Sequence, residues 1–360
     1  MLNKKNIIIL CIFLALSLFL VIWYFAPPSE EARKFSNKID QYQPEILTKE
    51  REDLLLEFDN FAFDYFPILD DDHPLFAYSY LFSDLHKFYK LRFDKLYAEI
   101  KNTQVPDGQI KLWYVYNMGV VAKTKNLTIG FDLAHKWIDF DIPKLADQLD
   151  ILIISHPHQD HYDSSLVKRA LSRGVAVVLP SGKIKEEWRK PIRSDPKGKE
   201  LKEIFGNSEN LISMDEDETK VIKQAKITAF AAEHGKGELP VPTRWFFVEI
   251  DGFTILHTDD AELIGSETGD AFKKIPQGID IFLMDIRSPN RLREISFLKP
   301  KIIIPLHHWE IFHGKPKTKG EGDFRKILSF KDEVHQQIPT SKVIPLIWGE
   351  SISLESESQT

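Results

Sequence analysis

An apolar run that leads directly into a cluster of metal-binding side chains constrains the fold of this chain more than any other feature. Ile151-Leu152-Ile153-Ile154 is apolar at every position, and residues 156–161 then contain three histidines and one aspartate. A run that is apolar on both faces is typical of a strand buried between two layers. We therefore expect a sheet covered by helices, with the polar cluster at the end of a buried strand.

The side chains of this cluster, His156, His158, Asp160 and His161, are of the types that bind zinc and similar divalent ions. Side chains two residues apart in an extended segment point the same way, so His156 and His158 are expected to bind one ion. Asp160 and His161 follow a bend and can turn towards a second ion. The only cysteine is Cys11, so His, Asp or Glu must supply every metal ligand.

The character of the sequence changes near residue 110, from helical spacing to short runs rich in Val, Ile, Phe and Tyr. Further strands are expected at residues 111–117, 127–132, 175–179, 225–232, 244–250, 253–258, 279–285, 301–305 and 343–348. A helix is expected at residues 164–173, with Asp163 as its N-cap. The expected fold class is therefore α/β (α+β).

The N-terminus carries an apolar segment of the length that a membrane-spanning helix needs. Residues 6–28 are uncharged and follow Lys4 and Lys5, and residues 7–26 are apolar almost throughout. A helix needs about 20 residues to cross the hydrocarbon core, and the two lysines favour a cytoplasmic N-terminus. We therefore expect a single-pass membrane protein that contacts the membrane through residues 6–26, with its catalytic domain on the extracytoplasmic side. A cleaved signal peptide is the alternative.

Four segments are expected along the chain. Residues 1–28 are a transmembrane signal anchor, 29–105 a helical N-terminal region, 106–350 the main domain and 351–360 a disordered tail rich in Ser and Glu. Leu54, Leu55, Phe58 and Phe61 recur at helical spacing in the second segment. The formal net charge of −7 gives no general attraction to nucleic acid, so no nucleic-acid partner is expected.

The run His156-x-His158-x-Asp160-His161 resembles the signature of the metallo-β-lactamase superfamily. The resemblance extends over roughly residues 110–350, and it implies an αββα sandwich with a two-metal site at the edges of its sheets. His158 stands where the flavodiiron branch of the superfamily usually carries Glu. The resemblance therefore implies two divalent metal ions as cofactors, and zinc rather than iron.

The resemblance also implies where the remaining metal ligands lie, each after an expected strand. His234 would complete the first site, Asp260 would bridge both ions, and His307, in a Pro-x-His pattern, would bind the second ion. Asp259 and His308 stay open as alternatives, because this chain has Asp-Asp where Gly-Asp is usual, and two adjacent histidines. Neighbouring side chains at a strand end project to opposite sides, so only one of each pair is expected to face the metals. The full expected set is His156, His158, Asp160, His161, His234, Asp260 and His307.

Other residues are expected around this set. Asp132 ends a strand at a position where the family often has Asp, and the resemblance implies that it holds the neighbouring loop by hydrogen bonds. His135 and His308 are further candidates to contact a ligand or the substrate, whereas His257 is expected to be an ordinary strand residue.

The expected activity is hydrolysis by a hydroxide that two metal ions activate at ordinary pH. Asp160 and Asp260 would hold the ions, and Asp260 would orient the nucleophile. The ligand arrangement looks most like the branch that contains lactonases and N-acyl-phosphatidylethanolamine phospholipase D-like enzymes, which implies a small-molecule or lipid-like substrate with a phosphodiester or a lactone or other ester. The alternatives are a β-lactamase-type amide hydrolase and a non-catalytic, metal-stabilised binding module.

Overall fold

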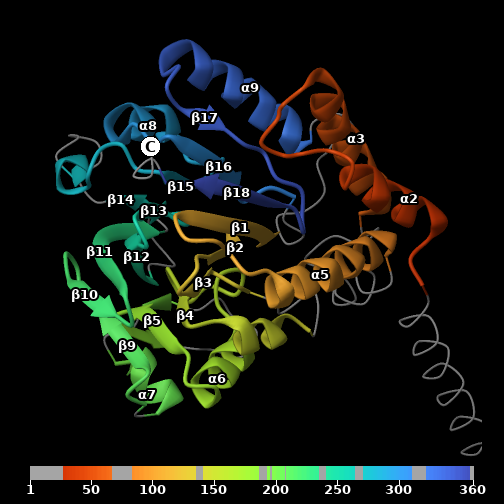
Figure 1. Cartoon of the computed structure of the whole chain (residues 1–360). Helices are drawn as coiled ribbons and strands as arrows, with labels where there is room; N and C mark the ends of the chain where they lie inside the picture. Colours follow the sequence, from red (N-terminus) through yellow and green to blue (C-terminus); the bar gives the residue numbers. More distant parts are fainter. Residues whose placement is uncertain are drawn as a thin grey trace, which may run out of the picture.

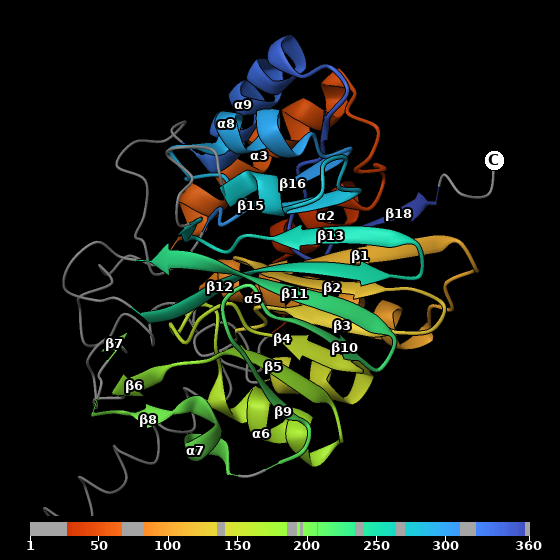
Figure 2. The same ribbon diagram turned by 90° about the vertical axis from the view of Figure 1, so that its left-hand side faces the viewer.

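The computed structural model consists of two β-sheets with helices on their outer sides (Figure 1, Figure 2). It describes residues 27–66, 83–134, 141–185, 193–194, 197–206, 208–234, 241–263, 271–309 and 322–356. The mixed α/β class expected from the sequence is confirmed. Ile151–Ile153 forms a fully buried strand, as its continuous apolar run predicts.

The first sheet has seven strands in the order β18-β1-β2-β3-β4-β5-β9. In chain order these strands are β1 (Gln109–Tyr116), β2 (Gly119–Lys123), β3 (Thr128–Phe131), β4 (Ile151–Ile153), β5 (Ala176–Pro180), β9 (Leu211–Met214) and β18 (Ser351–Glu355). Pairing is antiparallel from β18 to β3 and parallel from β3 to β9. Because β3 and β4 are parallel, the segments that follow them emerge at the same edge of the sheet.

The second sheet has eight strands in the order β10-β11-β12-β13-β15-β16-β17, with β14 paired to β11. These strands are β10 (Thr219–Ile222), β11 (Ala225–His234), β12 (Val241–Ile250), β13 (Phe253–His257), β14 (Glu262–Leu263), β15 (Ile281–Asp285), β16 (Ile302–Leu306) and β17 (Lys342–Val343). β13, β15 and β16 are parallel neighbours. Their carboxyl ends therefore lie along one edge, which brings the residues after β13, β15 and β16 together.

A small third sheet and the helices complete the described elements. The small sheet pairs β6 (Lys183–Lys185) with β7 (Arg193–Ser194) and β8 (Lys199–Glu200). The helices are α2 (Glu30–Ile39), α3 (Lys49–Tyr65), α5 (Asp84–Asn102), α6 (Ser164–Ser172), α7 (Leu201–Phe205), α8 (Arg291–Leu298) and α9 (Asp323–Gln337), with 3-10 turns η1 (Ile142–Gln148) and η2 (Ala271–Lys274). α5 and α6 contact β1 and β5 of the first sheet, and α9 contacts β17 of the second.

α6 begins where the sequence predicts. The Asp163 carboxylate accepts hydrogen bonds from the backbone N–H groups of Ser165 and Leu166 and so caps the helix. The loop that carries the polar cluster is therefore fixed at both ends, by the buried strand β4 before it and by the capped start of α6 after it.

The N-terminal helices share the hydrophobic core of the sheets. Phe58 of α3 packs edge-on against Trp348 at 5.7 Å between ring centroids, and also lies 5.8 Å from Phe88 of α5. Arg92 of α5 is buried, and its Nε donates to the carbonyl oxygen of Trp348 at 2.9 Å. The described helices between residues 29 and 105 are thus packed on the C-terminal part of the chain.

Two features of the C-terminal part differ from the sequence-based expectation. Of the strand expected at residues 343–348, only Val343 lies in a strand, β17 (Lys342–Val343), and the Ile344 N–H adds one further hydrogen bond to the Ile303 carbonyl. Residues 351–355, expected to belong to a disordered tail, are ordered instead, because Ser351–Glu355 pairs with β1 as the strand β18 and buries Ile352. Residues 357–360 lie outside the described part of the chain.

The predicted membrane localisation is corrected. Among the helices that the structure describes, none is both long enough and apolar enough to cross a membrane. The longest of these, α5 with 19 residues, carries Lys87, Lys90 and Asp94 and has one buried face, as an amphipathic helix does. This finding contradicts the predicted single-pass localisation with an extracytoplasmic catalytic domain. The segment proposed to span the membrane, residues 6–26, lies outside the described residues.

A buried glutamate in α8 predicts a stability that depends on pH. Burial raises the pKa of Glu294 to about 7. The hydrogen bond that its carboxylate accepts from the Ser288 hydroxyl acts to lower this pKa, but burial outweighs it. In the unfolded chain this carboxyl ionises near its usual pKa, so the folded state holds more protons as pH rises from about 4.5 to 7, and stability falls through this window. Because Gln carries no charge, Glu294→Gln should be more stable than the natural protein at pH 8, by about 3 kcal/mol.

Urea unfolding at pH 5 and pH 8 checks this expectation. Glu333→Gln, at a partly exposed site in α9, is the matched control and should change stability by about 0.5 kcal/mol or less. An equal effect of Glu294→Gln at both pH values would show that Glu294 does not titrate in this window.

Candidate metal centre

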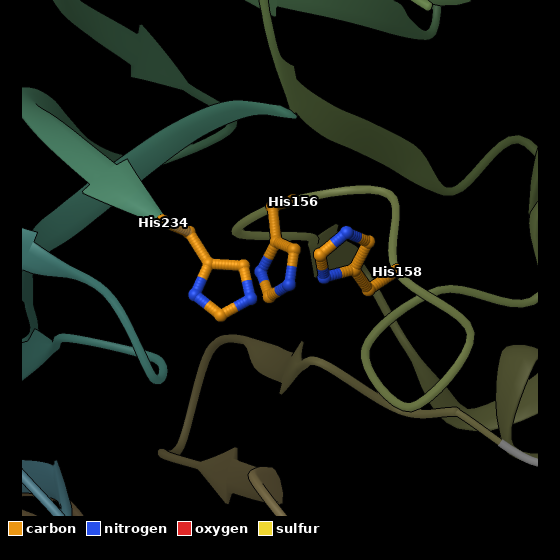
Figure 3. A group of neighbouring side chains, drawn as sticks. All are labelled: His156, His158 and His234. Carbon is orange, nitrogen blue, oxygen red and sulfur yellow. The ribbon is translucent and has the colours of Figure 1, made fainter. Parts of the chain in front are cut away.

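Three imidazole rings meet where the loop after β4 faces the end of β11. Figure 3 shows the rings of His156, His158 and His234 turned towards one another. The ring centroids of His156 and His158 are 4.7 Å apart, and each of these rings lies 4.8 Å from that of His234. One ring nitrogen from each lies within 4.8 Å of the other two, so the group can hold one metal ion.

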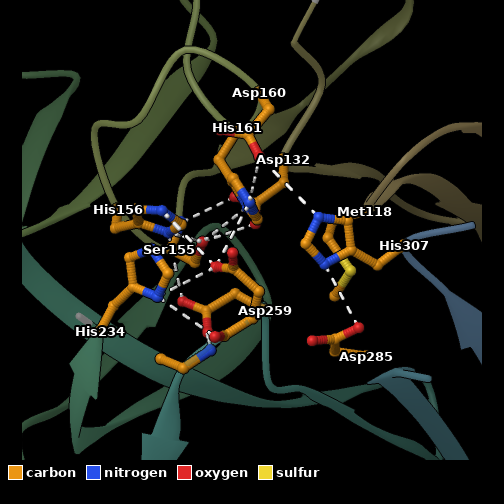
Figure 4. A network of polar contacts seen from close by, with 12 residues as sticks. Met118, Asp132, Ser155, His156, Asp160, His161, His234, Asp259, Asp285 and His307 are labelled. Atoms are coloured by element: carbon orange, nitrogen blue, oxygen red, sulfur yellow. Dashed lines mark hydrogen bonds and ion pairs between the residues drawn. The ribbon is translucent and has the colours of Figure 1, made fainter. Parts of the chain in front are cut away.

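A second group lies beside the first and contains Asp160, His161, Asp260 and His307. Asp160 and His161 lie in the loop after β4, Asp260 follows β13, and His307 follows β16. Figure 4 shows the side chains of Asp160, His161 and His307 close to one another. Asp260 lies between the two groups. Its Oδ1 is 3.6 Å from His156 Nε2 and 3.4 Å from His161 Nε2. A carboxylate in this position can contact ions held by both groups.

Four buried atoms in these groups have no hydrogen-bond partner among the residues that the structure describes. They are the Nε2 atoms of His156, His158 and His161, and Oδ1 of Asp260. A buried polar atom without a partner costs about 1–3 kcal/mol, so several in one place need a compensating interaction. Imidazole nitrogens and carboxylate oxygens are ligands of zinc and related ions. The residues present therefore fit a pair of divalent metal ions.

The electrostatics of the groups agree with this fit. Burial lowers the pKa of His156 well below its usual range and that of His158 to about 4, so both rings are neutral at pH 7, the form that binds metal. Burial also acts to lower the pKa of His161, but three neighbouring aspartates outweigh it and raise this pKa well above its usual value. Positive charge is therefore stabilised where these carboxylates meet.

Asp132, at the end of β3, holds His161 and the loop after β4. Its Oδ1 accepts from the Ser155 N–H at 2.7 Å, and its Oδ2 accepts from the Ser155 hydroxyl at 2.5 Å and pairs with His161 Nδ1 at 2.8 Å. When Nδ1 donates to this carboxylate, His161 Nε2 is left as the acceptor that faces the cluster. The position is the one expected for Asp132 from the sequence.

Loss of this contact should weaken metal binding without removing a ligand. We expect Asp132→Asn to lower zinc affinity by about 10–100-fold. The Asn amide has one acceptor oxygen, so it cannot accept hydrogen bonds from both Ser155 and His161 as the two carboxylate oxygens do. A competition titration with a chromogenic chelator measures this change. Asp107→Asn, at a side chain that is 73% exposed and paired with Lys125, is the control. Equal zinc affinity in the two variants would contradict the role of Asp132.

The side chains of the adjacent Asp259 and Asp260 do not project to opposite sides, as was expected for neighbours at a strand end. β13 ends at His257, and Asp259 has φ of +50°, a left-handed conformation in which the alternation of a strand is lost. Asp259 is buried, accepts from the Ala261 N–H at 2.6 Å, and has Oδ2 3.4 Å from His156 Nδ1. Both aspartates therefore reach His156, Asp260 at its Nε2 and Asp259 at its Nδ1, so the expectation that only one faces the cluster is wrong.

The two adjacent histidines do separate. His307 lies in the second group, whereas the ring of His308 packs against Tyr114 at 4.9 Å and Phe324 at 4.8 Å between centroids. Burial lowers the pKa of His308 to about 4, as in an apolar environment. His308 is therefore not brought together with the other candidates. His135 lies outside the described residues, and His257 is a strand residue of β13.

Three further residues around the site, Asp285, Arg287 and Asn117, were not identified from the sequence. Asp285 ends β15, and its Oδ1 is 3.3 Å from His307 Nδ1. Burial acts to raise the pKa of Asp285, but His307 and Arg287 outweigh it and lower this pKa. Asn117, in the turn between β1 and β2, has Nδ2 3.4 Å from Asp160 Oδ2, and its carbonyl accepts from the His307 N–H. An aspartate at the end of a fully apolar strand was the available signal for Asp285.

Comparisons with known proteins agree with this geometry. A family model described as "Beta-lactamase superfamily domain" matches residues 130–313, slightly more than half of the 360-residue chain. No curated protein matches the chain.

Several solved structures are similar to the chain. Igni18, a metallo hydrolase from Ignicoccus hospitalis, is 17% identical over 69% of this chain and 99% of its own, with a TM-score of 0.46. CmlA, a diiron β-hydroxylase from Streptomyces venezuelae, is 14% identical over 70% of this chain and 55% of its own, with a TM-score of 0.48. An isothiocyanate hydrolase from Delia radicum gut bacteria is 15% identical over 68% of this chain and 99% of its own, with a TM-score of 0.45.

Proposed function

This chain belongs to the metallo-β-lactamase superfamily of metal-dependent hydrolases, and we propose that it uses two zinc ions to hydrolyse a phosphodiester, or a lactone or other ester, in a small-molecule or lipid-like substrate. The observation that carries the proposal is the position of Asp260, whose Oδ1 lies within 3.6 Å of ring nitrogens from both groups of ligands. The order of the ligands along the chain is the reason for preferring the lactonase and N-acyl-phosphatidylethanolamine phospholipase D-like branch.

Each group of side chains has a distinct part in this proposal. His156, His158 and His234 would hold one ion, Asp160, His161 and His307 would hold the other, and Asp260 lies near ligands of both. When bound, two such ions lower the pKa of a water molecule towards neutrality and polarise the bond that is to be broken. The protein's own contribution is to fix these ligands in place before the substrate arrives.

The residues that contact the ligands determine which nitrogen of each ring faces the ions. Asp132 holds His161 by Nδ1, and Asp285 lies at Nδ1 of His307, so that Nε2 of both rings points towards Asp160. Asn117 Nδ2 also donates to Asp160 Oδ2, at 3.4 Å. Such contacts fix the tautomer and orientation of a ligand, and their loss weakens metal binding and activity.

The proposal is tested on the purified full chain. Elemental analysis should find close to two divalent ions per chain, after reconstitution with zinc where necessary. The zinc-loaded protein should hydrolyse bis-p-nitrophenyl phosphate or a lactone, and iron-loaded protein serves as the comparison for metal identity. Absence of bound metal after reconstitution would refute the two-metal site. Hydrolysis of a β-lactam alone would assign the amide-hydrolase alternative, and two bound ions without any hydrolysis would favour a binding module.

A further inference from the structure

Arg287 lies directly beside the second group of ligands. It follows β15, and its backbone N–H donates to Asp285 Oδ1 at 2.8 Å, while its Nε is 3.5 Å from the same oxygen. Its Nη2 contacts both ring nitrogens of His307. The side chain is 38% exposed. The backbone N–H and Nε of Arg287 thus contact Asp285, while its guanidinium reaches the ring of His307, which is proposed to bind the second ion.

The Arg287 guanidinium and a metal ion would approach the same atom, His307 Nε2. His307 Nε2 faces Asp160 Oδ2 at 3.9 Å, so an ion held by these two residues lies next to the Arg287 contact. A guanidinium and a divalent cation repel each other strongly at such short range. With an ion bound at His307 Nε2, the guanidinium would have to turn away from this nitrogen. The bonds of its backbone N–H and Nε to Asp285 keep it at the edge of the site.

A guanidinium held beside a bound metal ion is suited to an anion. Its planar fork of N–H donors matches the oxygens of a phosphate or a carboxylate, and it cannot lose its charge at ordinary pH. We propose that Arg287 binds an anionic oxygen of the substrate next to the second metal ion and so makes the site selective for negatively charged esters, phosphodiesters above all. This inference rests on the proposed two-metal hydrolase and specifies its substrate class.

A purely structural role for Arg287 gives a different expectation. If Arg287 only braced Asp285, its loss would disturb His307 and lower metal content, whatever the charge of the substrate. If it binds the substrate, its loss leaves the metal ions in place and affects anionic ligands alone. Phosphate binding, metal content and the charge of the substrate therefore separate the two roles.

The experiment measures binding of inorganic phosphate to the zinc-loaded full chain by calorimetry. Arg287→Gln is expected to keep its metal content and to bind phosphate about 10–100-fold more weakly, as for loss of a charge-assisted hydrogen bond. The same variant should lose a similar factor in kcat/KM for bis-p-nitrophenyl phosphate, but change by less than about threefold for the neutral p-nitrophenyl acetate. Arg287→Lys should recover part of the phosphate affinity, because it keeps the charge but not the fork.

Arg293→Gln is the matched control, since it removes the same charge from α8, where the Arg293 guanidinium lies over the ring of Phe297 at 5.8 Å. It should bind phosphate like the natural protein. Unchanged phosphate affinity in Arg287→Gln, an equal loss in Arg293→Gln, or loss of metal together with activity on both substrates would overturn the inference. Those results leave the proposed function standing, whereas a natural protein that binds no metal would overturn both.

Discussion

Asp260→Ala is expected to abolish hydrolysis and to reduce the metal content to fewer than two ions per chain. The Asp260 carboxylate oxygen lies near ring nitrogens of both ligand groups, so its removal should take a ligand from each ion at once. His307→Ala should abolish hydrolysis as well, through loss of the second ion. Elemental analysis and bis-p-nitrophenyl phosphate hydrolysis measure both effects.

The adjacent residues provide the matched controls. Asp259→Asn keeps the left-handed backbone conformation, which Asn tolerates, and changes only the carboxylate oxygen that lies 3.4 Å from His156 Nδ1. It should retain both ions and lose activity by about 10–100-fold. His308→Ala should retain both ions and measurable activity, because the His308 ring packs against Tyr114 and Phe324. Loss of metal in the controls but not in Asp260→Ala would show that the ligand assignment is one residue out of register.

Asp59→Ala is expected to have the largest effect on stability, although α3 is far from the metal centre in the sequence. Asp59 is buried and accepts hydrogen bonds from Trp309 Nε1 at 2.6 Å and from the N–H groups of Phe324 and Arg325 at 3.0 Å. Its loss leaves two buried donors and one partly buried donor without their acceptor, which should lower the free energy of unfolding by about 3–5 kcal/mol.

The same contact links α3 to the metal centre. Trp309 follows His307 by two residues and has φ of +51°, so the chain after His307 is held in a turn that Asp59 stabilises. We therefore expect Asp59→Ala also to weaken binding of the second ion. Asp53→Ala is the control in the same helix, because Asp53 is 62% exposed and forms a surface ion pair with Lys49. It should change stability by about 1 kcal/mol or less. Equal stability of the two variants in urea would contradict this role of Asp59.

The residues that the sequence predicts well are those controlled by local geometry. His156 and His158 follow a buried strand at a spacing of two, and the structure places their rings together with that of His234. The N-cap at Asp163 and the position of Asp132 after β3 depend likewise on a few neighbouring residues. Local periodicity and capping chemistry are enough to place such residues.

The residues that the sequence did not predict depend on contacts between distant segments. Asp285 and Arg287 reach His307 only because β15 and β16 are parallel neighbours. Asn117 reaches Asp160 from a turn in the same sheet, 43 residues away. The prediction for Asp259 failed because side chains alternate only within a strand. β13 ends at His257, two residues before Asp259, and Asp259 itself has a left-handed backbone conformation. Short-range patterns carry no information on such pairings.

Anomalous diffraction from crystals of the zinc-loaded full chain tests the two-metal site most directly. The account predicts two anomalous peaks per chain, one among His156, His158 and His234 and the other among Asp160, His161 and His307, with the Asp260 carboxylate between them. A single peak, no peak, or ions bound by Asp259 or His308 in place of Asp260 or His307 would contradict it.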